Sequence, residues 1–299
     1  MVSETDVCVI GGGPAGLAAA IAARRRGLSV VVMDGLRPPI DKACGEGLMP
    51  DSRRAAARLG IEIPAAMGFE FPGIRFHGAG RSVEAQFPDG CGIGVRRIAL
   101  HQAMIDSAVR AGVELRWESP VSRFRDLKAR WIVGADGASS RVRRWAGLDS
   151  CVRNSRRLAY RQHFAIAPWT DCMEIYWGVG CQIYVTPVGA REVCVALISK
   201  APELRLWEAL ERFFPVLRAR LAGVEVTSRE RGSVTATMRL RTVARANVAL
   251  IGDASGSVDA ITGEGLCLSF RQAELLADAM SSGDLAGYDR AHPRLAVRP

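Results

Sequence analysis

The chain has 299 residues, with 40 lysines and arginines against 31 acidic residues, a formal net charge of +9. This length can bury a large core, in one large domain or in two domains whose segments alternate along the chain. No apolar stretch reaches the roughly 18 residues of a membrane span, and acidic residues, not a basic targeting region, precede the first predicted strand. We therefore expect a cytoplasmic protein.

The charge and the cysteines exclude two further classes. Aromatic residues form only 6% of the chain and do not alternate with the basic residues, which argues against nucleic-acid binding. A solvated arginine-rich surface explains the charge better, and a weak peripheral attraction to a membrane surface stays open. The eight cysteines form no C-x-x-C and no Cys/His cluster at metal-ligand spacing, so no metal is predicted.

A glycine motif follows the first predicted strand, Val7–Ile10. Its G-x-G-x-x-G spacing permits a tight turn, close approach of a pyrophosphate, and close packing of helix on strand. The phosphates would meet the positive end of the next helix, predicted at 17–26 and ended by Gly27. The residues of the motif are Gly11, Gly13, Pro14, Ala15 and Gly16.

A second predicted strand, 28–33, leads into Asp34, about 20 residues beyond the motif. An acid at this place accepts hydrogen bonds from the adenosine ribose, which favours FAD or NAD over NADP. A glycine turn without a ligand is the alternative. The order of strand, helix, strand and acid favours a nucleotide site.

The remaining pattern divides the chain into two parts. Helices are predicted at 51–59, 97–112, 202–221 and 266–280. Strands are predicted at 74–76, 83–87, 113–117, 131–135, 160–167, 173–177, 181–186, 193–198 and 248–251, with further strands in 224–238. The short aromatic and β-branched runs after about residue 160 are typical of an antiparallel sheet. We predict a discontinuous nucleotide-binding domain (1–70, 95–150 and 245–299) and an inserted β-sheet substrate domain (71–94 and 151–244).

Two more glycine motifs follow predicted strands. One runs from Gly134 to Arg141 and contains Asp136. The other begins with Gly252 and Asp253 and continues to a second glycine pair, Gly263 and Gly265. A carboxylate at the end of a strand can accept hydrogen bonds from sugar-like hydroxyls, and a helix beginning near the second pair would direct free N–H groups at a ligand. Turn and N-cap aspartates are the alternative explanation.

In this order, over nearly the whole chain, the three motifs resemble those of FAD enzymes related to para-hydroxybenzoate hydroxylase and geranylgeranyl reductase. The resemblance implies an α/β fold: a three-layer, Rossmann-like FAD-binding domain of glutathione reductase type, with an inserted, mainly antiparallel β-sheet substrate domain. It implies that Asp253 holds the ribityl chain and that the helix near Gly265 faces the flavin. It also implies that Asp136 and Arg141 lie near the pyrophosphate and that Arg97 contacts the FAD phosphates.

The segment Cys44-Gly-Glu-Gly47 resembles the C-G-x-G segment that geranylgeranyl reductases place beside the isoalloxazine. This implies that Cys44 touches substrate or relays a proton and that Glu46 is a candidate acid. An inert packing thiol and a solvated carboxylate are the alternatives. The resemblance also implies a substrate pocket on the inserted sheet, with core packing as the alternative. The implied pocket residues are Tyr176, Trp177, Tyr184 and Pro187.

Three functions fit this pattern. The first is a reductase that transfers hydride from reduced FAD to a C=C bond of an apolar or aromatic small molecule. The second is an FAD- and NAD(P)H-dependent monooxygenase that hydroxylates or epoxidises; Ser255 and Gly256 replace the Ala-His pair usual in aromatic hydroxylases, which weakens it. The third is a non-catalytic or truncated flavin-binding protein, because the chain is shorter between Trp117 and Trp131 than in relatives and ends at Pro299, where they continue. With one G-x-G-x-x-G motif, NAD(P)H would dock transiently as the electron donor.

Overall fold

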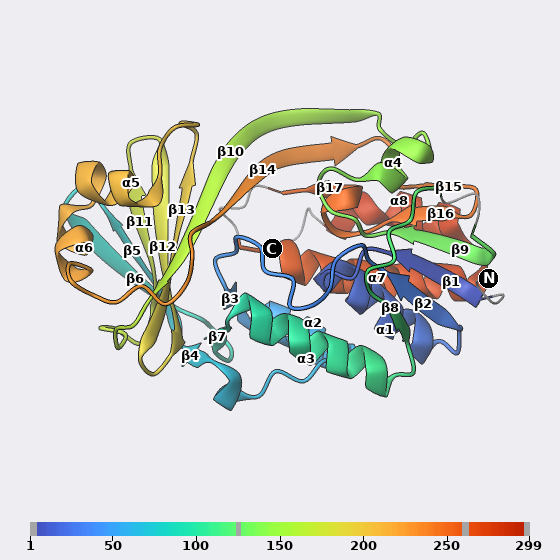
Figure 1. Cartoon of the computed structure of the whole chain (residues 1–299), viewed down its shortest axis with the longest axis horizontal. Coiled ribbons are helices and arrows are strands. Elements are labelled where there is room, and N and C mark those ends of the chain that lie inside the picture. Colours follow the sequence, from blue (N-terminus) through green and yellow to red (C-terminus); the bar gives the residue numbers. More distant parts are fainter. Residues whose placement is uncertain (1–4, 124–126, 259–262, 296–299) are drawn as a thin grey trace.

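The computed structural model describes residues 5–123, 127–258 and 263–295. Figure 1 shows a part built of a sheet with helices and, beside it, a part built mainly of long strands. The first sheet has the order β15-β16-β9-β1-β2-β8 and is parallel except for β15. Its strands are β1 (Thr5–Ile10), β2 (Val30–Met33), β8 (Glu114–Arg116), β9 (Ala129–Gly134), β15 (Ala244–Arg245) and β16 (Val248–Leu250).

The centre of this sheet is apolar on both faces. In β1, Val7 pairs with Val30 of β2 and with Trp131 of β9, and the residues from Val7 to Ile10 are buried. Strands covered on both sides need such continuous apolar runs. The predicted strand before the glycine motif is therefore confirmed as the middle of a Rossmann-like sheet.

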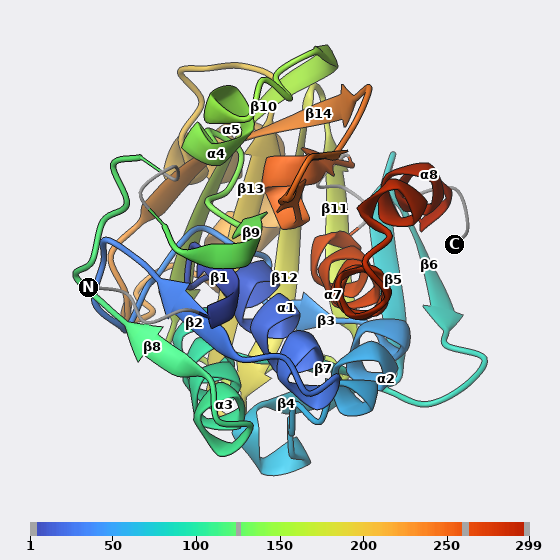
Figure 2. The same ribbon diagram turned by 90° about the vertical axis from the view of Figure 1, so that its right-hand side faces the viewer.

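Helices pack on this sheet and on one another. The alanine-rich α1 is buried along most of its length against α7 and α3, and Figure 2 shows α1 beside α7. The predictions did not include α4 and α8. The helices of this part are α1 (Pro14–Arg25), α2 (Pro50–Arg58), α3 (Arg97–Arg110), α4 (Arg141–Trp145), α7 (Gly265–Ser282) and α8 (Leu285–Leu295), with 3₁₀ turns at Ala65–Met67 and Gly252–Ser255.

The second part is a large sheet of order β17-β14-β10-β13-β12-β11-β5-β6, antiparallel except where β5 pairs with β11. Its strands are β5 (Gly73–Gly78), β6 (Arg81–Gln86), β10 (Cys151–Phe164), β11 (Met173–Gly178), β12 (Cys181–Gly189), β13 (Glu192–Ser199), β14 (Arg231–Leu240) and β17 (Gly256–Ser257). A small sheet joins β3 (Gly47–Leu48), β7 (Gly92–Gly94) and β4 (Phe69–Phe71). The expected α/β fold with a separate antiparallel sheet is confirmed, whereas the domain boundaries stay a prediction.

Two short helices cover one face of the large sheet. These are α5 (Leu206–Phe213) and α6 (Pro215–Arg220), which bury Leu210 and Leu217 against the sheet. The single helix predicted at 202–221 is therefore wrong. Proline has no N–H and its ring clashes with the preceding turn, so the chain breaks at Phe214 and Pro215 begins a new helix. No helix among the described residues has the length and apolar character to cross a membrane.

Candidate functional site

A cavity of about 610 Å³ lies between the two parts, at the carboxyl ends of β1, β9 and β16. Ligands of open α/β sheets bind at this edge, and the volume falls in the range of about 300–1,000 Å³ typical of small-molecule sites. The Rossmann-like side contributes residues 10, 11, 13–15, 33–36, 135–138, 252, 253, 263–266, 268 and 269. The large sheet contributes 159–161, 173, 184, 196, 198 and 233–236, and the loop 40–47 closes a third side.

The three glycines of the first motif have different physical reasons. A Cβ on Gly11, whose φ is +114°, would lie 2.4 Å from the carbonyl oxygen of Ala135, and one on Gly16 would lie 1.9 Å from that of Gly11. Packing inside the fold therefore requires these two. A Cβ on Gly13 would meet no described atom within 4 Å, and Gly13 lines the cavity. The space at Gly13 is available to a ligand.

The first turn of α1 adds donors at the same place. Gly13 is its N-cap, Pro14 its first residue and Ala15 part of the cavity wall. No described side chain caps this end, so the N–H groups of the first turn face the cavity at the positive end of the helix. This arrangement suits an anion.

Asp34 holds the glycine loop. Its carboxylate accepts hydrogen bonds from the N–H of Gly12 at 2.7 Å and of Leu36 at 2.8 Å. His101 of α3 also holds the glycine loop: its Nε2 donates to the carbonyl oxygen of Gly12 at 2.7 Å. Burial lowers the pKa of His101, so the imidazole is neutral. Asp34 lines the cavity, where its remaining lone pairs can accept from a ligand.

Two cations and one carboxylate share another part of the wall. Arg97 is the first residue of α3, and its Nε is buried without a hydrogen-bond partner among the described residues. Asp253 follows β16 and reaches into the cavity, where desolvation raises its pKa while Lys42 and Arg97 lower it less strongly. The buried, unpaired nitrogen of Arg97 is the kind of donor that a phosphate oxygen satisfies.

Asp136 borders the cavity, but its carboxylate is already engaged inside the protein. It accepts from Ser140 Oγ at 2.5 Å and from the N–H of Arg141 at 2.6 Å and of Val142 at 3.2 Å. These bonds cap the N-terminal turn of α4. These are the hydrogen bonds of a capping aspartate, and contact of Asp136 with FAD stays a prediction.

The third motif directs a long helix at the cavity. Gly252 has φ +61° and donates its N–H to Gln272 Oε1 at 2.9 Å, while Gly263 has φ +67°. Helix α7 then begins at Gly265, lines the cavity with its first turn and has no side-chain cap among the described residues. Its dipole places positive potential at this end of the cavity.

Comparisons with known proteins also indicate a nucleotide cofactor in this cavity. Residues 6–63 match the family model of an FAD binding domain. A menaquinone reductase of Mycolicibacterium smegmatis is 29% identical, over 99% of this chain and 81% of its own. A digeranylgeranylglycerophospholipid reductase of Methanothrix thermoacetophila is also 29% identical, over 93% of this chain and 79% of its own. The FAD-domain match and reductase relatives along almost the whole chain decide the class.

This chain is an FAD-dependent oxidoreductase. Its relatives and solved neighbours support the resemblance to enzymes of the para-hydroxybenzoate hydroxylase and geranylgeranyl reductase type. Among solved structures, PqsL of P. aeruginosa in complex with 2-aminobenzoylacetate is similar, with a TM-score of 0.81 and 25% identity over 99% of this chain and 93% of that one. The flavin-dependent brominase Bmp2, with a TM-score of 0.86 and 19% identity over 98% and 83%, is similar in fold alone.

FAD fits the residues of the cavity on three observations. Gly13 leaves space where a pyrophosphate would approach the backbone, and the buried Nε of Arg97 has no partner in the part of the chain that the structure describes. The uncapped start of α7 at Gly265 offers donors to a group that becomes anionic on reduction. The assignment of single residues to parts of FAD remains a prediction.

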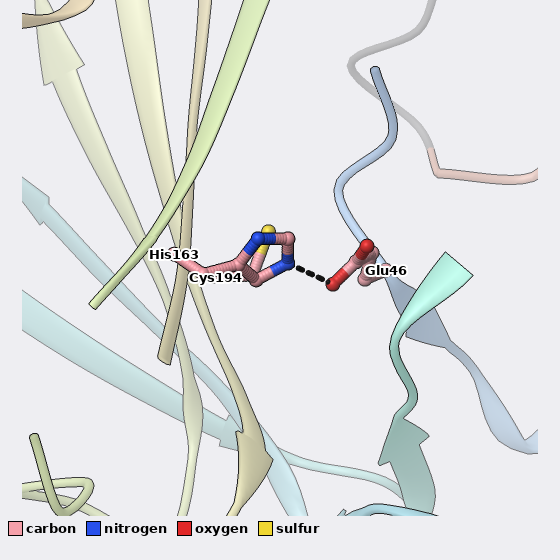
Figure 3. Close-up of side chains that lie close together, drawn as sticks. All are labelled: Glu46, His163 and Cys194. Atoms are coloured by element: carbon pink, nitrogen blue, oxygen red, sulfur yellow. Dashed lines mark hydrogen bonds and ion pairs between the residues drawn. The ribbon is translucent and has the colours of Figure 1, made fainter. Parts of the chain in front are cut away.

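The loop with Cys44 and Glu46 crosses the cavity wall beside the large sheet. The Cys44 thiol accepts the N–H of Glu46 at 3.4 Å. Glu46 adopts φ +59°, in the left-handed region, and its side chain is buried, so it is not the solvated carboxylate considered from sequence. Its Oε1 accepts from the N–H of Arg97 at 2.9 Å, and its Oε2 lies 2.6 Å from Nε2 of His163 (Figure 3).

Sequence reasoning missed His163 and Arg161, both buried on β10. Their i, i+2 spacing places them on one face of the strand, but nothing in the sequence indicates that this face meets Glu46, 117 residues away. With Lys42 of the loop, they are polar residues near the cavity that the sequence did not indicate.

Glu46, His163 and Cys194 could together be taken for a metal site, since their ligand atoms lie within 4.8 Å of one another. Two observations oppose it. The Arg161 guanidinium lies 3.1 Å from His163 Nδ1 and would repel a cation. Burial also raises the pKa of the Cys194 thiol well above its usual value, which disfavours the thiolate that a metal needs.

Of the four aromatic and proline residues expected in the pocket, only Tyr184 lines the cavity. Tyr176 lies on the opposite face of β11, where its hydroxyl donates to Glu174 at 2.9 Å, and Trp177 is half exposed. Pro187 packs with its carbonyl against Gly94 of β7. The strand register decides which residues of β11 face the cavity. Ile175, not Tyr176, pairs with Tyr184 and shares its face of the sheet.

Proposed function

We propose that this FAD-dependent oxidoreductase reduces a C=C bond of an apolar organic substrate. The observation that carries the proposal is the apolar wall that the large sheet presents to the cavity, opposite the FAD-binding segments. Its members Met173, Tyr184, Ala196 and Ile198 are buried in one cluster and line the cavity. The relatives named as menaquinone and digeranylgeranylglycerophospholipid reductases support this choice.

FAD, once reduced, supplies the hydride for this chemistry. The chain must then bind the apolar substrate, keep water out and deliver a proton. The sheet wall performs the first two tasks. Cys44 is the proposed proton donor, because it lines the cavity and carries a thiol proton, whereas both oxygens of Glu46 are occupied by protein donors.

NAD(P)H is the proposed source of electrons, docking transiently. The first glycine motif and Asp34 already form the site assigned to FAD, so the nicotinamide has to approach the cavity from outside.

Monooxygenation is the second candidate. The likeness to PqsL, which was solved with an aromatic acid and also described as a probable FAD-dependent monooxygenase, favours it. The same apolar wall suits an aromatic substrate. The reductase relatives cover the chain at slightly higher identity, and this places reduction first.

The test is single-turnover reoxidation. The FAD-loaded protein is reduced with dithionite under nitrogen and mixed with menaquinone or geranylgeraniol, and the return of oxidised-flavin absorbance is followed. Reoxidation without oxygen, with formation of the saturated product, is the expected result. Absence of this reaction, together with oxygen-dependent product formation from an aromatic acid, would replace reduction with monooxygenation. NADH and NADPH in place of dithionite test the donor.

A further inference from the structure

A buried carboxylate and imidazole connect the two parts of the molecule, and the reaction proposed above does not use the imidazole. Glu46 comes from the loop that lines the cavity, and His163 comes from β10 of the large sheet (Figure 3). The side chain of Glu46 is 1% exposed and that of His163 is 0% exposed. Burying such a pair is costly unless every polar atom finds a partner.

The partners of Glu46 belong to two different elements. Its Oε1 accepts the N–H of Arg97, the first residue of α3, and its Oε2 faces His163 Nε2. Glu46 also holds a backbone conformation with φ +59°, which a non-glycine residue adopts at a cost. One side chain therefore fixes the loop, the start of α3 and the sheet relative to one another.

Arg161 determines which imidazole nitrogen carries the proton. Two described groups face His163 Nδ1: a guanidinium nitrogen of Arg161 at 3.1 Å, which can only donate, and the Ser228 hydroxyl at 2.7 Å, which can donate as well. Nδ1 therefore accepts. The proton is then on Nε2 and points at Glu46. Arg161 is itself held by an ion pair with Asp41 and a hydrogen bond to the carbonyl oxygen of Lys42 at 3.2 Å.

We propose that His163, held in this tautomer by Arg161, is a positioning residue: through Glu46 it places the Cys44–Gly47 loop and Arg97 for FAD. The proposal depends on FAD binding and not on the reaction catalysed. It explains why two buried polar residues lie on the same face of the large sheet as the apolar wall and meet a loop of the other part.

The experiment compares three variants of the full chain. His163→Leu removes the donor to Glu46, and His163→Gln restores an N–H near the position of Nε2. His77→Leu is the matched control, since His77 Nε2 lies 2.9 Å from Glu174 Oε1 in the same sheet but does not line the cavity. The readouts are FAD affinity of the apoprotein, the visible spectrum of bound FAD, and the melting temperature without FAD.

We expect His163→Leu to bind FAD about tenfold more weakly, because a lost hydrogen bond to a charged group has this order of effect, and to shift the flavin spectrum. His163→Gln recovers most of the affinity. His77→Leu lowers the melting temperature alone. Parental FAD affinity and spectrum in His163→Leu, or no recovery in His163→Gln, would overturn the proposal.

Glu46→Gln provides a further test should His163→Leu fail to fold. Both neighbours of Glu46 donate, and an amide can accept from only one of them, so this isosteric change should also weaken FAD binding. Parental affinity in Glu46→Gln contradicts the positioning role. So does stoichiometric zinc binding by the parent that Cys194→Ser abolishes, because the cluster would then be a metal site.

Discussion

The two walls of the cavity are built by different means. The Rossmann-like wall works through its backbone: glycines that leave space, helix ends that direct N–H groups, and a few carboxylates that hold loops in place. The large sheet works through side chains, with an apolar face toward the cavity and one polar group, around His163, that reaches across to Glu46. The first wall suits a cofactor with fixed phosphates, and the second suits a substrate whose shape varies.

The sharpest test of this contrast uses two glycines of one motif. Gly16→Ala puts a Cβ 1.9 Å from a backbone oxygen, so we expect a loss of more than about 3 kcal/mol in the free energy of unfolding, measured by urea titration. Gly13→Ala meets no described atom and should fold normally while binding FAD more weakly. Equal stability of the two variants would refute the division of roles.

Substitution of Asp253 is expected to have the next largest effect, on FAD binding. Asp253→Ala should abolish FAD retention, which shows as loss of yellow colour on gel filtration. The raised pKa of Asp253 means that the unfolded chain loses this proton first, so apoprotein stability falls as pH rises from about 3.8 toward the folded pKa and stays lower above it. Asp253→Asn should therefore melt at a higher temperature than the parent at pH 7 without FAD. A yellow Asp253→Ala variant would remove this residue from the site.

His292 of α8 tests the support behind the same segment. Its Nε2 lies 3.0 Å from Ser255 Oγ, and burial lowers its pKa to about 4. The unfolded chain takes up this proton near pH 6.5, so stability falls between pH 6.5 and 4, by up to about 3 kcal/mol. His292→Gln should flatten this part of the stability–pH curve. An unchanged curve would show that His292 does not carry the acid sensitivity.

The smallest effects belong to the aromatic residues of the sheet. Tyr184→Ala should weaken menaquinone binding about tenfold, since the substitution opens the apolar wall. The affinity is measured by the change that menaquinone produces in the flavin spectrum. Trp177→Ala should leave that change as it is, because Trp177 lies outside the cavity. The reverse result would restore the pocket expected from sequence.

The same contrast explains what sequence could predict. Backbone requirements leave a spacing signal, so the glycine motif, β1, α1 and Asp34 could all be found by pattern. The sheet wall could not, because register and strand alternation decide which side chains face inward; they turned Tyr176 away and brought His163 to Glu46. Pro215 carried a helix-break signal that the amphipathic pattern of 202–221 concealed.

The pairing of the two-residue strand β17 with β14 has a mechanical consequence. Gly256 and Ser257 come directly after the 3₁₀ turn that carries Asp253, and they pair with Arg239 and Met238 of β14. The segment that follows the Rossmann-like strand β16 is thus hydrogen-bonded to the edge of the large sheet. Hinge opening of the two parts would break this strand pairing, so we expect ligands to enter through loop movements and heating to unfold both parts in one transition.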